Sequence, residues 1–452
     1  MSVFKAYDIR GTYPDQIDLE LARRVGRAFA DFLGKGPLVV GRDMRTMAVE
    51  VQSAFIEGVL DAGIDVLDIG LASTPQTYYA IGSLKAAGGA AVTASHNPAQ
   101  YIGFKVTREE AIPISGDTGL KDIEKLATTP EAPAPVAQRG SVTQVDTLPG
   151  YLDHVCRWAD IARPVKIASD AANGMAAHTF PALLERLPEI ENHGLYFELD
   201  GTFPNHEANP LKHSNLVDLQ AKVRETGAEL GAAFDGDSDR CCFVDETGRP
   251  LGNDIITTLV AREVLKKEKG AAIVYDLRSS WVLPETVLAG GGKPVKERVG
   301  HSFLKERMRE HDAPFGGELS GHYYFRKNWY ADNSEIILLA VLNILSRSEK
   351  TLSQLADELL CYHSTGEINF EVADKAGALQ KLKDSFPDGQ IDELDGVTIA
   401  YGQPDQPGWW WVNLRPSNTE PLLRMTLEAD EAEVMERQKA KVIEILGVQP
   451  EE

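Results

Sequence analysis

Apolar runs that end abruptly in polar loops alternate with helical segments through the first three quarters of this chain. Examples of such runs are residues 37–43, 165–170 and 230–234. Continuous apolar runs are typical of strands buried on both faces of a parallel sheet, whereas a strand with one solvent face alternates apolar and polar residues. The scheme appears three times although the residues do not repeat. We therefore predict an α/β protein with three similar domains and mixed, mostly parallel sheets.

The last part of the chain differs from the first three quarters. A proline-rich segment at residues 130–136 interrupts the pattern before a predicted helix at 148–159, and from about Gly366 the elements suggest a smaller α+β unit. At roughly 150 residues per domain, length alone suggests about three domains, and the pattern gives four. The predicted domains are residues 1–145, 146–253, 254–365 and 366–452.

Composition narrows the function classes. The chain has 46 Lys+Arg and 68 Asp+Glu, a net charge of −22, so we expect neither a nucleic acid nor a membrane as partner. The four cysteines show no spacing for zinc. The N-terminus lacks the apolar region of a signal peptide, and the longest apolar run, 336–345, is about half of the roughly 20 residues that a bilayer requires. We expect a cytoplasmic location.

A dense oxygen cluster follows the run at 230–234. Asp235, Asp237 and Asp239 alternate around Gly236, so one turn can fold all three carboxylates around a hard cation such as Mg²⁺ or Ca²⁺. The alternatives are a solvated acidic turn and a calcium-binding EF-hand, in which Glu246 would take loop position twelve. The EF-hand fits poorly, since position six should be glycine and is Arg240. A cation beside an arginine suits a phosphate ligand.

A serine ends another apolar run. Ser95 precedes His96, Asn97 and Pro98 at the end of the predicted strand 90–94 and is a plausible nucleophile. A Ser-His-Asp hydrolase is the obvious alternative, but the G-x-S-x-G elbow is absent. Ser95 and Asn97 can also simply cap a turn.

Two further loops carry binding groups. Glu318, Ser320 and His322 alternate, so in an extended segment they point the same way, as groups that bind sugar hydroxyls do; a polar strand face is the alternative. The loop at 415–421, followed by Arg424, offers a guanidinium, two hydroxyls and an amide for a phosphate or carboxylate; a surface turn is the alternative.

Together and in this order, the four loops resemble those of the α-D-phosphohexomutase superfamily, in particular its phosphomannomutase/phosphoglucomutase branch. The resemblance joins the phosphoserine loop at 93–98, the metal loop at 235–240, the sugar-recognition loop at 317–322 and the phosphate loop at 415–421, with further matches at 7–11 and 300–302. It implies four domains around a central cleft. It also implies an enzyme that moves phosphate between O1 and O6 of a hexose through a phosphoserine and a hexose 1,6-bisphosphate.

The resemblance assigns roles to residues. Ser95 is the expected phosphoserine, and Mg²⁺ on Asp235, Asp237, Asp239 and a Ser95 phosphate oxygen would balance its charge of about −1.5 to −2. The other expected catalytic residues are Arg240 to share the developing charge, Lys105 and His301 as acid and base candidates, and His96 and Arg10 to hold the phosphoserine region. The expected substrate-binding residues are Tyr7, Arg278, Glu318, Ser320, His322, Arg415, Ser417, Asn418, Thr419 and Arg424.

The resemblance leaves the sugar open. A site that contacts chiefly O3 and O4 separates glucose from mannose weakly, because the two sugars differ at C2, so we expect mannose, glucose or both. Leu319 stands where the glucosamine-mutase branch usually carries Gln, which argues against an amino sugar. A phosphoglucosamine mutase, a non-catalytic metal-binding relative and a phosphatase stay as alternatives. We expect a monomer or a weak homo-oligomer.

Overall fold

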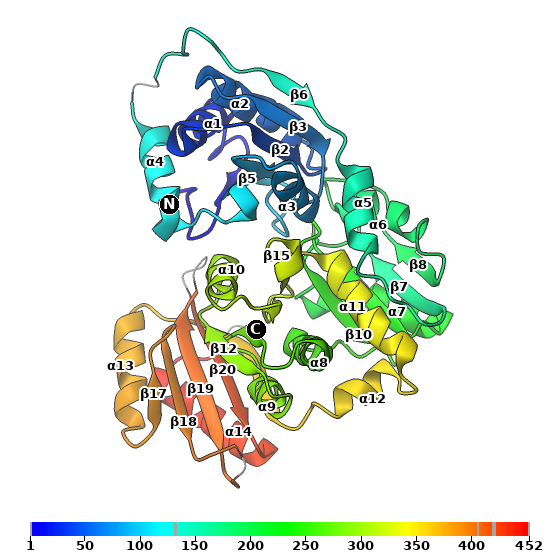
Figure 1. Ribbon diagram of the computed structural model, residues 1–452. Helices are drawn as coiled ribbons and strands as arrows, with labels where there is room; N and C mark the ends of the chain where they lie inside the picture. The colour runs from blue at the N-terminus through cyan, green and yellow to red at the C-terminus, as the bar shows by residue number, and fades with distance from the viewer. Residues whose placement is uncertain (1, 131–132, 405, 418–421, 451–452) are drawn as a thin grey trace.

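The computed structural model describes residues 2–130, 133–404, 406–417 and 422–450. They form a six-stranded, a four-stranded and two five-stranded sheets, which follow one another along the chain. Figure 1 shows each sheet with its own helices, from the blue N-terminal domain to the orange and red C-terminal one. The predicted α/β class, with three α/β domains and a smaller C-terminal α+β domain, is confirmed.

The first domain contains β1 (Ile9–Thr12), α1 (Leu19–Leu33), β2 (Leu38–Arg42), α2 (Ala48–Asp61), β3 (Val66–Leu71), α3 (Thr74–Ser83), β4 (Gly88–Val92), β5 (Tyr101–Arg108), α4 (Lys121–Thr128) and β6 (Val142–Gln144). Its sheet order is β1-β5-β4-β2-β3-β6, with β4, β2, β3 and β6 parallel. Parallel strands end at the same edge, so the loop after β4 opens at one edge of this sheet.

The second domain contains α5 (Leu148–Cys156), β7 (Val165–Asp170), α6 (Ala176–Leu184), β8 (Ile190–Leu195), α7 (Val217–Thr226), β9 (Leu230–Phe234) and β10 (Cys241–Asp245). Its sheet order is β10-β9-β7-β8, with β9 and β10 forming an antiparallel hairpin. The sequence predicts a strand at 194–199, but β8 lies earlier because it pairs with β7 from Ile190 onward. Tyr196 then adopts a φ of 58° and ends the strand.

The third domain contains α8 (Asn253–Lys267), β11 (Ala272–Asp276), α9 (Val282–Ala289), β12 (Lys293–Glu297), α10 (His301–Glu310), β13 (Phe315–Gly317), β14 (Tyr323–Phe325), β15 (Ala331–Asp332), α11 (Ser334–Arg347) and α12 (Leu352–Asp357). Its sheet order is β12-β11-β13-β14-β15. In Figure 1, α11 lies beside α8 and β10, which both contact it. Through α11 the second and third domains share one apolar core, in which Ile336 and Leu339 join Phe234 and Ile256.

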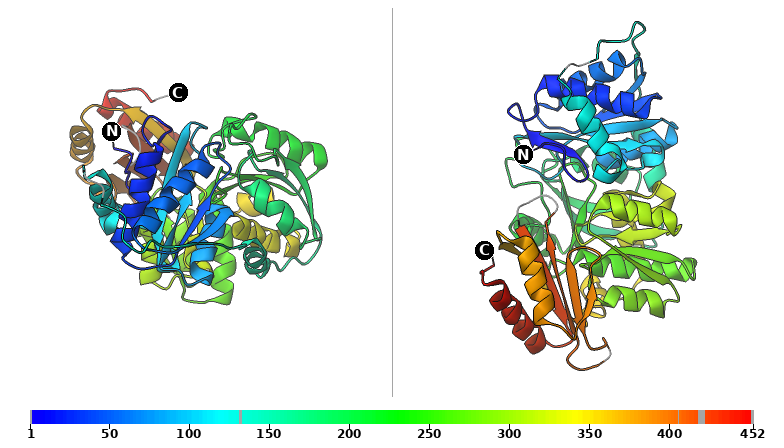
Figure 2. Two further views of the ribbon diagram at one scale, coloured as in Figure 1. Left: turned by 90° about the horizontal axis from the view of Figure 1, so that it is seen from above. Right: turned by 90° about the vertical axis from the view of Figure 1, so that its left-hand side faces the viewer.

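The C-terminal domain contains β16 (His363–Glu371), α13 (Lys375–Ser385), β17 (Gln390–Asp392), β18 (Val397–Tyr401), β19 (Trp410–Pro416), β20 (Leu422–Ala429) and α14 (Ala432–Leu446). Its antiparallel sheet has the order β16-β20-β19-β18-β17. One face packs with α13 and α14 into a separate small core. Figure 2 shows this domain set beside the third domain, at the opposite end of the molecule from the first.

None of the helices within the described residues is both long and apolar enough to span a membrane.

Candidate active site

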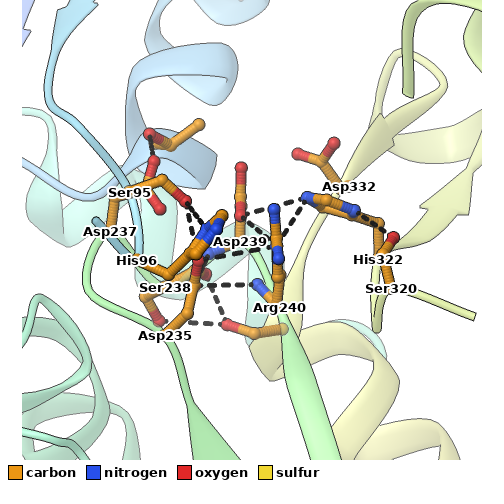
Figure 3. Close-up of polar contacts among 12 residues, drawn as sticks. Ser95, His96, Asp235, Asp237, Ser238, Asp239, Arg240, Ser320, His322 and Asp332 are labelled. Carbon is orange, nitrogen blue, oxygen red and sulfur yellow. Dashed lines mark hydrogen bonds and ion pairs between the residues drawn. The ribbon is translucent and has the colours of Figure 1, made fainter. Parts of the chain in front are cut away.

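Ser95 and the acidic loop meet although 140 positions separate Ser95 from Asp235. The Ser95 hydroxyl donates a hydrogen bond of 2.9 Å to Asp235 Oδ2, and both side chains are buried. Ser95 follows β4 in the left-handed region with a φ of 52°, a strained conformation that is often found at functional sites. Gly236 permits the approach, because a Cβ there would lie 2.4 Å from the carbonyl oxygen of Ser95. Figure 3 shows the two loops facing each other.

Three buried carboxylates form a cluster that can bind a metal ion. One oxygen each of Asp235, Asp237 and Asp239 lies within 4.8 Å of the others. Asp237 Oδ1 is buried and accepts no hydrogen bond from the described residues. Burial and the neighbouring carboxylates raise the pKa of Asp235 well above its ordinary value, because three adjacent buried charges repel each other. A cation would relieve that repulsion, so the donor set fits a hard metal ion.

Lys105 and Arg240 already place positive charge on this cluster. Lys105 Nζ, from β5, lies 2.6 Å from Asp237 Oδ2 and 2.5 Å from Asp239 Oδ2. Burial alone would lower the pKa of Lys105, but the three aspartates outweigh it and raise the pKa above its ordinary value. Arg240 Nε lies 3.7 Å from Asp235 Oδ2. Both cations therefore stay charged and lie against the acidic cluster.

The predicted histidines have different charge states. Burial, together with Arg240 and Arg10, lowers the pKa of His96 well below its ordinary value, and burial with Lys305 does the same for His301. Both imidazoles are neutral at pH 7. The His301 Nδ1 atom, at the start of α10, accepts or donates no hydrogen bond within the described part of the chain. It is free to contact a substrate.

His322 is instead charged and joins two loops. Burial and Arg240 would lower its pKa, but Asp239 and Glu318 raise it to about 9. His322 Nε2 lies 3.3 Å from Asp239 Oδ1, and Nδ1 lies 3.3 Å from Glu318 Oε2 and 2.8 Å from Ser320 Oγ. Figure 3 shows Ser320 and His322 on the opposite side of the acidic cluster from Ser95. The sugar-recognition loop therefore lies against the metal loop.

Glu318 is held in place by its neighbours. Its Oε1 accepts a hydrogen bond of 3.1 Å from the backbone N–H of Gly300, and its Oε2 accepts one from the Tyr324 hydroxyl. Burial would raise the pKa of Glu318, but His322 and the Tyr324 hydrogen bond lower it below the ordinary range. Glu318 is thus a fixed carboxylate, suited to accept hydrogen bonds from sugar hydroxyls.

Three arginines predicted to bind substrate converge on one carboxylate. Arg278, Arg415 and Arg424 each form an ion pair with Glu367, at 3.1, 2.8 and 3.1 Å. The backbone N–H of Ser417 donates to the carbonyl oxygen of Leu422 at 2.9 Å. Asn418 and Thr419 lie outside the described residues.

The N-terminal segment connects the first domain to the rest of the site. The Tyr7 hydroxyl donates to the carbonyl oxygen of Val299 at 2.9 Å, and the Tyr7 ring packs edge-on against His301 at 5.5 Å. The Arg10 guanidinium donates to Asn97 in the phosphoserine loop and pairs with Asp8. Tyr7 therefore links the first domain to the third, whereas Arg10 holds the phosphoserine loop within the first domain.

Sequence reasoning missed two residues that shape the serine and metal loops. Arg45 is buried and donates to the carbonyl oxygens of Ser95, Asn97, Pro98 and Tyr101 at 2.6 to 2.9 Å. Thr74, in the first turn of α3, donates its hydroxyl to Asp237 Oδ2 at 2.6 Å. Arg45 could have been noticed in the sequence, because it follows the polar end of a buried strand as the predicted site residues do.

The EF-hand alternative is wrong. The acidic loop connects β9 and β10, which pair with each other as antiparallel strands, whereas an EF-hand loop joins two helices. Glu246 lies away from the cluster, because its carboxylate accepts hydrogen bonds from the hydroxyl and backbone N–H of Ser353 at 2.5 and 3.1 Å.

Comparison with known proteins agrees with this site. Family models described as phosphoglucomutase/phosphomannomutase alpha/beta/alpha domains I, II and III match residues 1–133, 149–248 and 252–362, and the model of the C-terminal domain matches 367–445. The fold and the site define the protein as a phosphohexomutase, which is an isomerase. The chain belongs to the phosphoglucomutase/phosphomannomutase family.

Individual relatives cover the whole chain. A phosphomannomutase of Escherichia coli is 40% identical over 441 residues, which are 95% of each protein. A Xanthomonas campestris protein named phosphohexose mutases is 40% identical over 99% of both chains. A crystal structure of a phosphoglucomutase/phosphomannomutase family protein from Burkholderia thailandensis superposes with a TM-score of 0.89 and 33% identity, covering 99% of this chain and 98% of that one.

Proposed function

We propose that this chain interconverts the 1- and 6-phosphates of mannose, glucose or both, with Ser95 as the residue that carries the phosphoryl group. The observation that carries the proposal is the buried hydrogen bond of 2.9 Å between Ser95 and Asp235, inside a cluster that also holds Lys105 and Arg240. Phosphoryl transfer depends on positioning and charge neutralisation, and this cluster supplies both.

The reaction consists of two phosphoryl transfers. In the first, a substrate hydroxyl oxygen attacks the phosphorus on Ser95 and the P–O bond to Ser95 Oγ breaks. The hydroxyl proton passes to a base, and the leaving Ser95 oxygen takes up a proton to become a hydroxyl again. The product is hexose 1,6-bisphosphate, which then reorients in the site so that its other phosphate faces Ser95. In the second, Ser95 Oγ gives up its proton and attacks the other phosphate. The P–O bond to the sugar breaks, and an acid returns a proton to the leaving sugar oxygen. Neutral His301 supports a role as this acid and base, because its Nδ1 has no hydrogen-bond partner among the described residues.

The acidic cluster supports Mg²⁺ as the metal. Asp235, Asp237, Asp239 and a phosphate oxygen on Ser95 would hold the ion, which would neutralise negative charge on the transferring phosphoryl group. Lys105 and Arg240 add fixed positive charge on the same side. His96 and Arg10 keep the phosphoserine loop in place, since Arg10 donates to Asn97.

The substrate must bind in both orientations. We assign the phosphate that is not transferred to Arg415, Ser417, Asn418, Thr419 and Arg424, with Arg278 and Tyr7 beside them. Glu318 and Ser320 would hold O3 and O4, with His322 fixed between Ser320 and Asp239. This assignment places no residue at C2, where the two sugars differ, which supports activity on both glucose and mannose phosphates.

Activity assays test the proposal directly. The purified protein, with Mg²⁺ and a trace of glucose 1,6-bisphosphate, is given mannose, glucose and N-acetylglucosamine 1-phosphates in parallel. We expect 6-phosphates from the first two and a species heavier by about 80 Da, one phosphoryl group, that Ser95→Ala lacks. Failure to convert either hexose phosphate contradicts the proposal. Conversion of the amino sugar alone would favour a phosphoglucosamine mutase. Release of phosphate at a comparable rate would favour a phosphatase. Metal binding without turnover would favour a non-catalytic relative.

Other properties stay predictions from the sequence. They are the domain boundaries after residues 145, 253 and 365, the cytoplasmic location, the monomeric or weakly oligomeric state, and the absence of nucleic-acid and membrane partners.

A further inference from the structure

We propose that Glu367 is a positioning residue that holds Arg278 of the third domain and Arg415 and Arg424 of the C-terminal domain together as one phosphate-binding group. The inference rests on the proposed function, since it deepens the role of the same three arginines. Glu367 does not itself contact substrate in this proposal. It sets the distance and orientation of the guanidinium groups that do.

The contacts of Glu367 cross a domain boundary. Its Oε2 accepts hydrogen bonds from Arg278 Nη1 at 3.1 Å and Arg415 Nη2 at 2.8 Å, and its Oε1 accepts one from Arg424 Nη1 at 3.1 Å. The Arg278 guanidinium is fixed in position, because Asp276 at the end of β11 accepts hydrogen bonds from its Nε and Nη2 at 3.1 and 2.8 Å. Glu367 therefore ties the C-terminal sheet to a fixed point on the third domain.

The strand register explains why a carboxylate is needed at this position. Arg415 on β19 stands directly opposite Arg424 on β20, and like charges at such positions destabilise a sheet. Glu367 on β16 is opposite Thr426, two residues from Arg424, so its side chain lies on the same face of the sheet. Its negative charge lies where the two guanidinium groups would otherwise repel each other.

A local irregularity of the backbone directs Glu367 to this place. The pairing of β16 with β20 shifts register between Ser364 and Glu367, and Gly366 adopts a φ of 64° within the shift. Bulges of this kind re-aim the next side chain and often lie beside active sites. The position of the carboxylate is thus built into the strand.

The burial and charge of the group agree with a permanent role. The Arg415 side chain is only 2% exposed and that of Arg278 only 7%, so their positive charges need a nearby partner. Burial would raise the pKa of Glu367, but the three arginines lower it to about 2, which keeps the carboxylate ionised. Each guanidinium has five N–H donors and gives one to Glu367. Arg278, which also gives two donors to Asp276, and Arg415 therefore keep further N–H donors for a phosphate.

Two variants distinguish the proposed positioning of the arginines from the general effect of losing an ion pair between the third and C-terminal domains. Glu367→Gln removes the charge at nearly constant shape. Asp392→Asn is the matched control, because Lys296 and Asp392 form another ion pair between the same two domains at a distance of 2.5 Å, outside the proposed site. We measure KM and kcat for mannose and glucose 1-phosphates, the inhibition constant of inorganic phosphate, and the melting temperature. We expect Glu367→Gln to raise KM and the inhibition constant at least tenfold with kcat within about threefold, and Asp392→Asn to change neither constant more than twofold.

Several outcomes would overturn the proposal. One is an unchanged KM in Glu367→Gln, another is a lower KM, which would make Glu367 a competitor of phosphate, and a third is an equal rise in both variants. If Glu367→Gln does not fold, Glu367→Asp keeps the charge on a shorter side chain. A raised KM in that variant supports the proposal, and a wild-type KM contradicts it.

A second readout does not depend on turnover. Inorganic phosphate, added without divalent metal, should raise the melting temperature of the wild type and of Asp392→Asn but not of Glu367→Gln. If the wild type converts no hexose phosphate and this difference is still seen, the proposed function fails and the role of Glu367 holds. If all three proteins respond equally, the role of Glu367 fails whatever the activity.

Discussion

At the scale of single residues, Lys105 is the cation that lies nearest to the acidic cluster. Its ammonium pairs with Asp237 and Asp239 in the interior. Lys105→Met removes the ammonium partner of Asp237 and leaves Asp239 with His322 and Arg240. We predict a cost of up to about 3 to 5 kcal/mol without metal. The melting temperature in EDTA should fall by several degrees, and Mg²⁺ should restore most of it. In the wild type, the same Mg²⁺ addition should shift the melting temperature much less. Equal Mg²⁺ responses in the two proteins would contradict this prediction.

Ionisation of Glu428 makes the free energy of unfolding depend on pH. Its buried Oε2 accepts hydrogen bonds of 2.9 Å from the Trp281 backbone N–H and from Trp411 Nε1. Burial raises its pKa to about 7, whereas the unfolded chain has a pKa of about 4.3. The folded state therefore favours the protonated carboxyl group. The contribution of this group to the free energy of unfolding is complete below pH about 4.3 and is lost as pH rises to about 7.

The variant Glu428→Gln tests whether Glu428 lowers the stability of the protein as pH rises. Glutamine keeps an oxygen acceptor for both N–H groups but cannot ionise. We predict equal unfolding free energies for variant and wild type near pH 4, and a variant more stable by up to about 4 kcal/mol at pH 8, since 1.36 kcal/mol corresponds to one pKa unit. Urea unfolding at both pH values measures the difference. A variant that is less stable at pH 8 would show that Glu428 is ionised and favourably paired.

At the scale of elements, the loop between β4 and β5 depends on Arg45. Three backbone carbonyl oxygens of the loop, and that of Tyr101 at the start of β5, accept hydrogen bonds from the two terminal nitrogens of Arg45. Lysine has one nitrogen and cannot span them, so Arg45→Lys should let Ser95 shift. A displacement of about 1 Å can lower a rate by about 100-fold, and we expect a kcat loss of that order. Arg42→Lys, on β2 beside Asp43, is the control and should stay near wild type. An unchanged kcat in Arg45→Lys would exclude a positioning role.

The same loops show what a sequence can and cannot predict. Ser95, the three aspartates and Glu318 follow buried apolar runs as short polar motifs, so their types and spacing alone point to chemistry. Arg45 and Glu367 carry no such signal. The partners of Arg45 are carbonyl oxygens that converge only in the folded loop, and Glu367 faces the arginines only because of a register shift in β16. The strand predicted at 194–199 lies elsewhere for a related reason, since pairing with β7 rather than local composition fixes β8.

At the scale of the whole molecule, the cores predict how the chain unfolds. The second and third domains share one apolar core, whereas the C-terminal domain has a small core of its own. The contacts between that domain and the third are largely polar, as in the pairs Glu367–Arg278 and Lys296–Asp392, apart from the packing of Trp409 against Trp281 and Tyr362. Domains joined in this way can open separately. We therefore expect the C-terminal domain to unfold first.

Tryptophan fluorescence can detect that step. Three of the six tryptophans, Trp409, Trp410 and Trp411, lie together at the start of β19 in the C-terminal domain. During urea unfolding, the fluorescence midpoint should come at a lower concentration than the far-UV circular dichroism midpoint, because helices of all four domains contribute to the latter. Inorganic phosphate should raise the fluorescence midpoint alone, since it would bind arginines on both sides of the domain boundary. Coincident midpoints would mean that the polar contacts couple the C-terminal domain to the rest as tightly as a shared core does.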